Sequence, residues 1–389
     1  MLSKITQDAS ISAISAGFIA VLIGFSSSIA IVFQAAQASG ANVDQMQSWV
    51  WALGLGMGIT SFALSLYYKA PLIIAWSTPG AALLATSLSS TNLAETTGTF
   101  LVVGALIVAV GMTGLFGRIS QMIPMPIAAA MLAGVLVQFG LGLFDALANA
   151  SGLVATMLMG FLLFKRVLPR YAVALVLVIG MVYVFADGTF QSENLRLEIA
   201  KPVWVMPEFS LNSIIGIGVP LFIVTMTSQN LPGVAILKSS GYESQAISPL
   251  ISTTGFTTLI MAPFGGFTFN LAAITAAVCT SDESHPDKDR RYIAGLSAGV
   301  FNCIAGIFGA SIVGLFIAFP KAFVAALAGL ALLSTLGNSF NSAFEDSRFR
   351  EPAILTFLLT ASGLSFFGIS SAFWGLMLGM LSIVLLVKK

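Results

Sequence analysis

A polar cluster that could bind a ligand lies in an otherwise apolar stretch near the middle of the chain. The sequence TMTSQNLPG at 225–233 places Gln229 and Asn230 beside threonine and serine side chains. Amides in hydrocarbon are costly unless they are hydrogen-bonded, so they usually face a bundle interior or a substrate. We therefore expect Gln229 and Asn230 to contact a substrate, with hydrogen bonding between helices as the alternative.

Two segments interrupted by Pro and Gly could bind an anion. PLIIAWSTPG at 71–80 and PFGGFTFNLAAITAA at 263–277 each resemble extended chain that leads into a helix. Ser77 is the expected N-cap of the first helix, and Thr268 or Asn270 is the expected N-cap of the second. Irregular backbone at membrane depth is tolerated only where it packs in protein or lines a cavity. The alternative is a pair of kinks that only accommodate packing.

Two such helix starts facing each other would direct free N–H groups and positive dipole ends into one pocket. That pocket suits a carboxylate without a buried Lys or Arg, and no basic residue falls in the middle of an apolar stretch. Serines of the first apolar stretch could join it, although they could equally serve only close packing. The expected substrate-contacting residues are Ser77, Thr78, Gly80, Gln229, Asn230, Thr268, Phe269 and Asn270, together with Ser27 and Ser28.

Aromatic side chains flank these polar groups. Trp76, Phe267 and Phe269 lie within the two interrupted segments, and Phe33 follows the serines of the first apolar stretch. Such rings could stack on an aromatic ligand. Since the chain has 30 phenylalanines, packing against neighbouring helices or lipid is the alternative for each of them.

The composition places these segments in a membrane protein. Of 389 residues, 57% are apolar and 8% are charged, whereas about a quarter of a soluble domain is charged. The net charge of +1 argues against a nucleic-acid partner, which would require a basic patch. Cys279 and Cys303 form no CxxC motif or Cys/His cluster, so neither a metal site nor a disulfide is expected. We expect no cofactor.

The apolar stretches predict an all-α polytopic membrane protein with about fourteen spans. All 17 Lys and Arg residues except Arg196, Lys201 and Lys321 then fall on the side of the N-terminus, so both termini are expected in the cytoplasm. The predicted spans are 11–38, 46–68, 71–90, 97–117, 124–144, 149–165, 169–186, 211–237, 247–262, 264–280, 290–315, 318–336, 352–367 and 370–387.

Four pairs of segments recur in the same order in the two halves of the chain. Because an odd number of spans separates the copies, the second half must be inverted in the membrane relative to the first. The sequence therefore predicts a 7+7 inverted repeat, with similarity among Ala- and Gly-rich helices as the alternative. The pairs are 25–41 with 226–242, 71–86 with 263–277, 114–117 with 306–309, and 130–134 with 325–329.

A proton-coupling group is not evident, because every carboxylate lies in a predicted loop or at the end of a span. The best candidates lie in SDESHPDKDRR at 281–291: Asp282, Glu283, His285 and Asp287. His titrates near neutral pH and could pass protons at the cytoplasmic mouth. The alternative is a solvated loop whose carboxylates balance the neighbouring basic residues.

The chain contains several long motifs in order: AWSTPGAALL (75–84), TMTSQNLPG (225–233), AAITAAVC and HPDKD (within 272–289), LAGLALLST (327–335) and TASGLSFFGISSAFWGL (360–376). With these motifs the chain resembles, over nearly its full length, the benzoate:proton symporter (BenE) family. The resemblance implies uptake of an aromatic carboxylate coupled to protons in the bacterial inner membrane. It also implies the fold of uracil-permease-type and sulfate-permease-type transporters, with a core domain at 1–118 and 208–316 and a gate domain at 119–207 and 317–389.

We therefore expect a secondary transporter that imports benzoate with protons by alternating access, with a homodimer as one option. The resemblance to nucleobase transporters implies acidic residues where Gln229 or Asn230 and Thr268 or Asn270 stand here, and this difference favours an anion. The alternatives are a nucleobase or another anion as substrate, or an anion uniporter or channel. No HExxH, GxSxG or Ser/His/Asp set occurs in the spans, so an enzyme is not expected.

Overall fold

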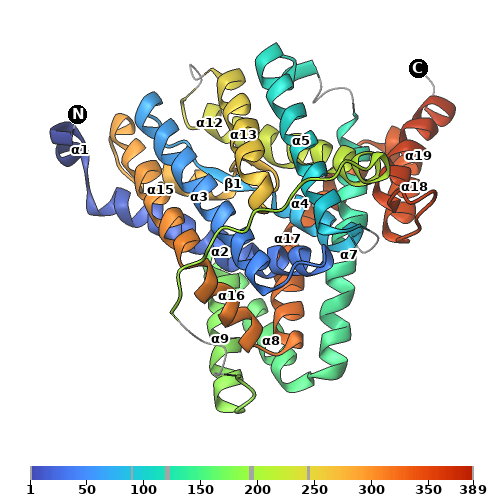
Figure 1. The fold of residues 1–389 in the computed structure, drawn as a ribbon, viewed down its shortest axis with the longest axis horizontal. Helices are drawn as coiled ribbons and strands as arrows, with labels where there is room; N and C mark the ends of the chain where they lie inside the picture. Colours follow the sequence, from blue (N-terminus) through green and yellow to red (C-terminus); the bar gives the residue numbers. More distant parts are fainter. Residues whose placement is uncertain (1, 89–90, 119–122, 192–196, 243–245, 388–389) are drawn as a thin grey trace.

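The computed structural model describes residues 2–88, 91–118, 123–191, 197–242 and 246–387. Helices surround a short two-stranded sheet in its interior (Figure 1). The helices of the first half are α1 (Leu2–Asp8), α2 (Ile11–Ala38), α3 (Val43–Tyr68), α4 (Thr78–Ser87), α5 (Leu93–Thr113), α7 (Met125–Asn149), α8 (Ser151–Val167) and α9 (Ala172–Ala186).

The second half begins with a helix that contains two π-helical turns. It runs through α10 (Leu211–Ser213), η4 (Ile214–Gly218), α11 (Val219–Thr225), η5 (Met226–Asn230) and α12 (Leu231–Ser239). The remaining helices are α13 (Ile247–Met261), α14 (Ile274–Thr280), α15 (Tyr292–Ile307), α16 (Gly309–Ala318), α17 (Lys321–Phe344), α18 (Arg350–Ala361) and α19 (Ser371–Leu386).

Each of the fourteen predicted stretches contains helix, although not always with the predicted bounds. Eight described helices are long and apolar enough to cross a bilayer, or nine if the bent pair α15–α16 counts as one span. The stretch predicted as one helix at 290–315 bends by 62° between Ile307 and Gly309. The end of the predicted span 71–90 and the predicted outer-loop residue Arg196 lie outside the described residues.

The two interrupted segments meet as strands β1 (Ile74–Trp76) and β2 (Phe269–Leu271). They pair antiparallel, with Ala75 opposite Asn270 and Trp76 opposite Phe269. Two further backbone bonds extend the ladder, from Ser77 N to Thr268 O at 3.1 Å and from Ala272 N to Ile73 O at 2.9 Å. The prediction of extended chain before each half-helix is confirmed. Each strand supplies the hydrogen-bond partners that the other lacks.

Two helix pairs pack around this sheet through small residues. Helix α3 packs along α15, where a Cβ on Gly306 would lie 3.0 Å from the Cα of Gly54. Helix α5 packs along α13, where a Cβ on Gly255 would lie 2.6 Å from the backbone nitrogen of Val108. Such close backbone approach is the usual way in which helices associate inside a membrane.

An extended strap, residues 197–210, crosses α15, α3 and α5 and is visible in light green in Figure 1. Its backbone nitrogens bind successive elements: Ala200 N donates to Ile307 O at 2.8 Å and Val203 N to Ser48 Oγ at 2.9 Å. Farther along, Glu208 N donates to Ala94 O at 3.0 Å. The strap therefore ties the ends of α15, α3 and α5 into one unit.

The α3–α15 contact gives a direct test of this packing. We expect Gly54→Ala to lower the free energy of unfolding by about 1–3 kcal/mol, because its Cβ would lie 2.6 Å from Gly306 N. Gly337→Ala is the matched control, since a Cβ there meets no atom within 4 Å. Thermal unfolding in detergent measures both variants, and equal stability of the two would contradict the assigned contact.

Candidate functional site

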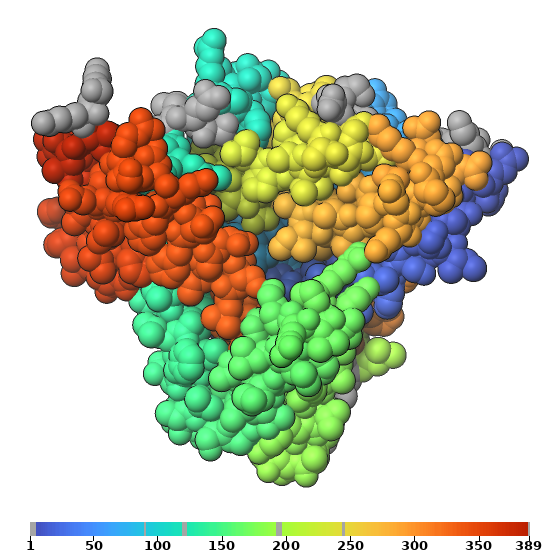
Figure 2. All heavy atoms as spheres, turned by 180° about the vertical axis from the view of Figure 1, so that it is seen from behind, coloured from blue at the N-terminus to red at the C-terminus, as the bar shows by residue number. Residues whose placement is uncertain are grey.

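A cavity of about 390 Å³ lies beside the two-stranded sheet. One wall comes from α2, β1, the start of α4, the π turn η5 and the start of α14. The facing wall comes from α7 and α17. From behind, a recess is visible where blue atoms of the N-terminal segment lie between the yellow and the orange-red segments (Figure 2). The cavity therefore lies where elements distant in the sequence meet.

The cavity is apolar with a few hydroxyl and amide groups, and no described residue that lines it carries a charge. This lining suits a small ligand that is mostly apolar and has one polar end. On the facing wall, one side of α17 contributes polar groups at helical spacing: Thr335, Asn338, Ser339 and Ser342. The prediction omitted these residues, although their i, i+3, i+4, i+7 spacing could have revealed them.

The first half-helix, α4, directs its start into this cavity. Ser77 is its N-cap, as predicted, and Ser77 Oγ accepts the backbone N–H of Gly80 at 3.0 Å. Pro79 has no N–H to offer, and Ala81 N bonds Ser77 O at 2.7 Å. Thr78 lines the cavity, and its N–H and hydroxyl have no partner among the described residues. Of the predicted contact residues here, Thr78 lines the cavity. Ser77 and Gly80 lie outside the lining and form the N-cap hydrogen bond of α4.

The second half-helix, α14, begins later than predicted. It starts at Ile274, after Ala273, and no side chain caps it. The prediction of Thr268 or Asn270 as its cap is wrong, because the backbone around both residues is used for pairing with β1. The uncapped start of α14 lies at the cavity, where Ala273, Ile274 and Thr275 form part of the lining.

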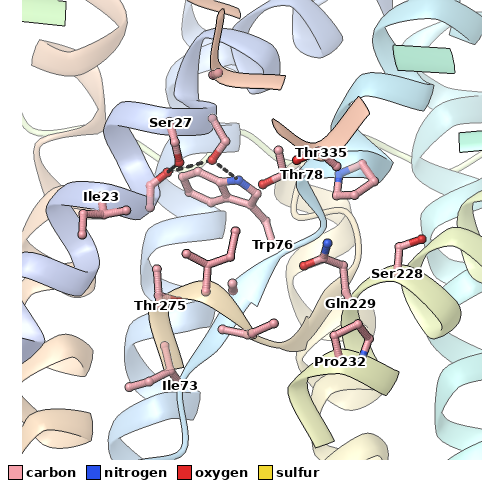
Figure 3. A pocket seen from close by; sticks show the side chains of 18 of the residues that line it. Ile23, Ser27, Ile73, Trp76, Thr78, Ser228, Gln229, Pro232, Thr275 and Thr335 are labelled. Atoms are coloured by element: carbon pink, nitrogen blue, oxygen red, sulfur yellow. Dashed lines mark hydrogen bonds between the residues drawn. The ribbon is translucent and has the colours of Figure 1, made fainter. Parts of the chain in front are cut away.

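The π turn η5 separates the roles of two neighbouring amides. Gln229 lines the cavity, and its side-chain amide has no hydrogen-bond partner among the described residues. Figure 3 shows this amide extending toward Trp76 and Thr78. Asn230 is fully buried, and its Oδ1 accepts the backbone N–H of Leu271 at 2.9 Å. A π turn inserts an extra residue and rotates side chains relative to an α-helix. Gln229 therefore faces the cavity, whereas Asn230 forms a hydrogen bond with the backbone of β2.

The remaining predicted residues of this segment are buried outside the cavity lining. Thr268 Oγ1 accepts the hydroxyl of Thr225 at 3.1 Å, and the backbone N–H of Phe269 donates to Thr258 Oγ1 at 3.1 Å. Asn270 donates its amide to Leu271 O at 3.0 Å. Thr268 and Phe269 therefore attach this segment to α11 and α13, whereas the Asn270 bond stays within β2 and its buried Oδ1 has no partner among the described residues.

Two serines of α2 line the opposite edge of the cavity. Both Ser27 Oγ and Ser28 Oγ donate to Gly24 O, at 3.1 and 2.8 Å. Ser28 Oγ also accepts the indole N–H of Trp76 at 3.0 Å. The structure thus brings Ser27, Ser28, Thr78 and Gln229 to one cavity, as predicted.

The candidate proton-coupling residues lie outside the cavity lining, in the loop after α14. Asp282 forms an ion pair with Arg291, and Glu283 forms one with Arg170 at 3.0 Å. Asp287 caps the short helix that follows, and His285 Nδ1 accepts Asp287 N at 2.9 Å.

The best-buried cation of that loop is Arg291, of which 7% is exposed. Its guanidinium donates to Thr280 O, the last carbonyl of α14, at 2.7 Å. A cation at this position stabilises the negative end of a helix dipole. The loop therefore anchors the half-helix at the end that points away from the cavity.

The division of roles between the neighbouring amides predicts different effects on stability. Asn230→Ala leaves the Leu271 N–H buried without a partner, which should lower the free energy of unfolding by about 1–3 kcal/mol. Gln229→Ala removes an amide that has no partner among the described residues and should leave it nearly unchanged. Thermal unfolding of the two variants measures this difference, and the reverse order would contradict the placement of the amides.

Comparison with known proteins identifies the family. The family described as "Benzoate membrane transport protein" matches residues 7–385. An "Inner membrane protein YdcO" from Escherichia coli (strain K12) is 48% identical over 94% of this chain and 93% of that protein. A "Benzoate membrane transport protein" from Acinetobacter baylyi is 43% identical over 100% of this chain and 98% of that protein.

Solved structures show the same fold at low sequence identity. The transmembrane domain of a cyanobacterial bicarbonate transporter, BicA, has a TM-score of 0.62 at 15% identity, covering 95% of this chain and 97% of that chain. Murine Slc26a9, an anion transporter, has a TM-score of 0.62 at 14% identity, covering 97% of this chain and 68% of that one. Together with the match to nearly every residue, these findings show that the chain belongs to the benzoate membrane transport protein family and is a multi-pass membrane transport protein, not an enzyme.

Proposed function

We propose that this protein imports benzoate, or a close aromatic carboxylate, in symport with protons across the bacterial inner membrane by alternating access. The observation that best supports this substrate assignment is the uncharged cavity at which two half-helices begin. A volume of about 390 Å³ falls within the range of small-molecule sites. The name of the Acinetobacter relative, a benzoate membrane transport protein, supports the same substrate.

The cavity offers a carboxylate hydrogen-bond donors and positive dipole ends but no charged partner. The N–H and hydroxyl of Thr78, the amide of Gln229 and the uncapped start of α14 all lie at its lining. Hydrogen bonds to a charged group contribute about 1.5–3 kcal/mol each, which suffices for reversible binding. A buried Lys or Arg would hold the anion more strongly and slow its release.

The aromatic ring would lie on the apolar side of the same space. Phe25 and Trp76 form part of the lining there, with ring centroids 4.9 Å apart and planes at 76°. This edge-to-face pair offers a third ring both an edge and a face. A nucleobase, which requires several polar partners around its ring, would leave this apolar corner unused.

The helix contacts support the proposed 7+7 inverted repeat. In this repeat α2 corresponds to α12, α3 to α13, α4 to α14 and α5 to α15. Exchanging these counterparts turns the pair α3–α15 into α13–α5 and the pair α2–α4 into α12–α14, and all four pairs are in contact. The pairs β1–β2 and α7–α17 exchange with themselves. A pseudo-two-fold axis in the membrane plane would produce this pattern.

We assign the cavity to the boundary between the proposed core domain (1–118 and 208–316) and the proposed gate domain (119–207 and 317–389). Only α7 and α17 among the lining elements belong to the gate. Motion of the core against the gate would therefore open and close the cavity, as alternating access requires.

The lining also indicates which side of the membrane the cavity faces. It uses residues 20–28 of α2, residues 125–132 of α7 and residues 331–342 of α17. With both termini in the cytoplasm, as the loop charges suggest, the α7 residues and most of the α17 residues lie in the cytoplasmic halves of their helices, whereas the α2 residues span the middle of that helix. We therefore assign the structure to an inward-facing state.

Transport of radiolabelled benzoate into proteoliposomes tests the proposal. We expect an inward proton gradient to accelerate uptake, and we expect Gln229→Ala to weaken benzoate binding about tenfold or more, the equivalent of one hydrogen bond to a charged group. Ser26→Ala is the matched control, because Ser26 is a buried serine outside the lining. Uptake of uracil but not benzoate would overturn the substrate assignment. A benzoate uptake rate that does not depend on the proton gradient would overturn proton symport.

For the loop at 281–291, we propose that it anchors α14 rather than relays protons. The ion pairs of Asp282 and Glu283 and the contact of Arg291 with the end of α14 support this role. His285→Gln should therefore keep gradient-driven uptake near the wild-type rate. Arg291→Gln, in contrast, should lower thermal stability, because it leaves Thr280 O without its cationic partner. Loss of gradient-driven uptake in a stably folded His285→Gln protein would reverse this assignment.

A further inference from the structure

A chain of hydrogen bonds fixes the indole of Trp76 in the cavity wall. The indole N–H donates to Ser28 Oγ at 3.0 Å, and the Ser28 hydroxyl donates to Gly24 O at 2.8 Å (dashed lines in Figure 3). A hydroxyl has one proton. Since that proton is directed to Gly24, the Ser28 oxygen faces Trp76 as an acceptor. Ser28 therefore has no proton left to donate to a carboxylate in the cavity.

The rest of Trp76 is held on the other sides. Its backbone lies in β1 opposite Phe269, and its backbone N–H lies 3.2 Å from the sulfur of Met57. Phe25 meets the indole edge to face, with ring centroids 4.9 Å apart. Only 4% of Trp76 and 3% of Ser28 is exposed. The indole has one polar atom, so the bond to Ser28 is the contact that selects one ring orientation from those the apolar walls would allow.

We propose that Ser28 is a positioning residue for substrate selection, which acts by orienting the Trp76 indole as a fixed wall for the aromatic ring of the carboxylate. This inference rests on the proposed function. Aromatic pairs gain stabilisation beyond simple burial only at defined offset-stacked or edge-to-face geometries. A fixed indole beside Phe25 therefore favours a flat aromatic ring over a saturated ring of similar size, whereas a freely rotating indole would favour neither.

The test compares benzoate with cyclohexanecarboxylate, which has the same charge and a saturated ring. Isothermal titration calorimetry on the purified protein gives the ratio of the two dissociation constants. We expect Ser28→Ala to reduce the preference for benzoate by about twofold to tenfold, the range of an aromatic-pair contribution. Ser26→Ala is the control, because Ser26 Oγ bonds Ile23 O within the same helix, away from Trp76. It should keep the wild-type ratio.

A double-mutant cycle separates positioning from a general effect on folding. Trp76→Phe keeps a ring but removes the indole N–H, so adding Ser28→Ala to it should change the benzoate preference no further. The double variant also avoids the buried unpaired N–H that Ser28→Ala alone creates. An equal effect of Ser28→Ala with Trp or Phe at position 76 would overturn the inference.

The outcomes also distinguish this inference from the proposed function. If the wild-type protein binds no benzoate, the proposed function itself fails. If it binds benzoate and Ser28→Ala keeps the same benzoate preference as Ser26→Ala, the proposed function stands and the role of Ser28 is rejected.

Discussion

Backbone that leaves the helical conformation inside a bilayer must find hydrogen-bond partners within the protein. Here the two interruptions, Ile74–Trp76 and Phe269–Leu271, supply those partners to each other as an antiparallel pair. Buried side chains complete the arrangement: Asn230 binds Leu271 N and Thr258 binds Phe269 N. Because the strands are fixed, the helices that follow them start at fixed places. Both starts reach the same cavity, and the proposed site depends on this arrangement.

The second consequence is electrostatic. A cavity without charged lining residues can accept a carboxylate only through hydrogen bonds and dipoles, which bind an anion without holding it permanently. Arg291 adds a positive charge at the far end of α14, where it stabilises the half-helix outside the cavity. The facing wall, α7 and α17, presents hydroxyls, amides and apolar groups. Such a wall can separate from the ligand at little electrostatic cost, as the proposed motion of the gate domain requires.

Much of this arrangement could be predicted from residue patterns. Apolar stretches located the helices, and Pro71 and Ser77 marked a break and a helix start that the structure confirms. The pairing of the strands could not be predicted, because it depends on contacts between residues almost two hundred positions apart. For the same reason the helix cap expected at Thr268 or Asn270 is absent, since pairing delays the start of α14.

The roles of Gln229 and Asn230 show a similar limit. Both are amides in one apolar stretch, and nothing in their identity distinguishes them. A π turn, which hydrophobic periodicity does not indicate, directs Gln229 to the cavity and Asn230 to the strand. The polar face of α17 was visible in the sequence at helical spacing, but only its position opposite the half-helices gives it a role.

The most direct test of the account is the location of bound 4-bromobenzoate, determined from the anomalous signal of the bromine in crystals of the complex. The account predicts the carboxylate near Thr78, Gln229 and the start of α14, with the bromine-bearing ring beside Phe25 and Trp76. A bromine site outside the cavity, or a carboxylate held by the charged loop at 281–291, would contradict the central claim that two helix starts in an uncharged cavity bind the substrate.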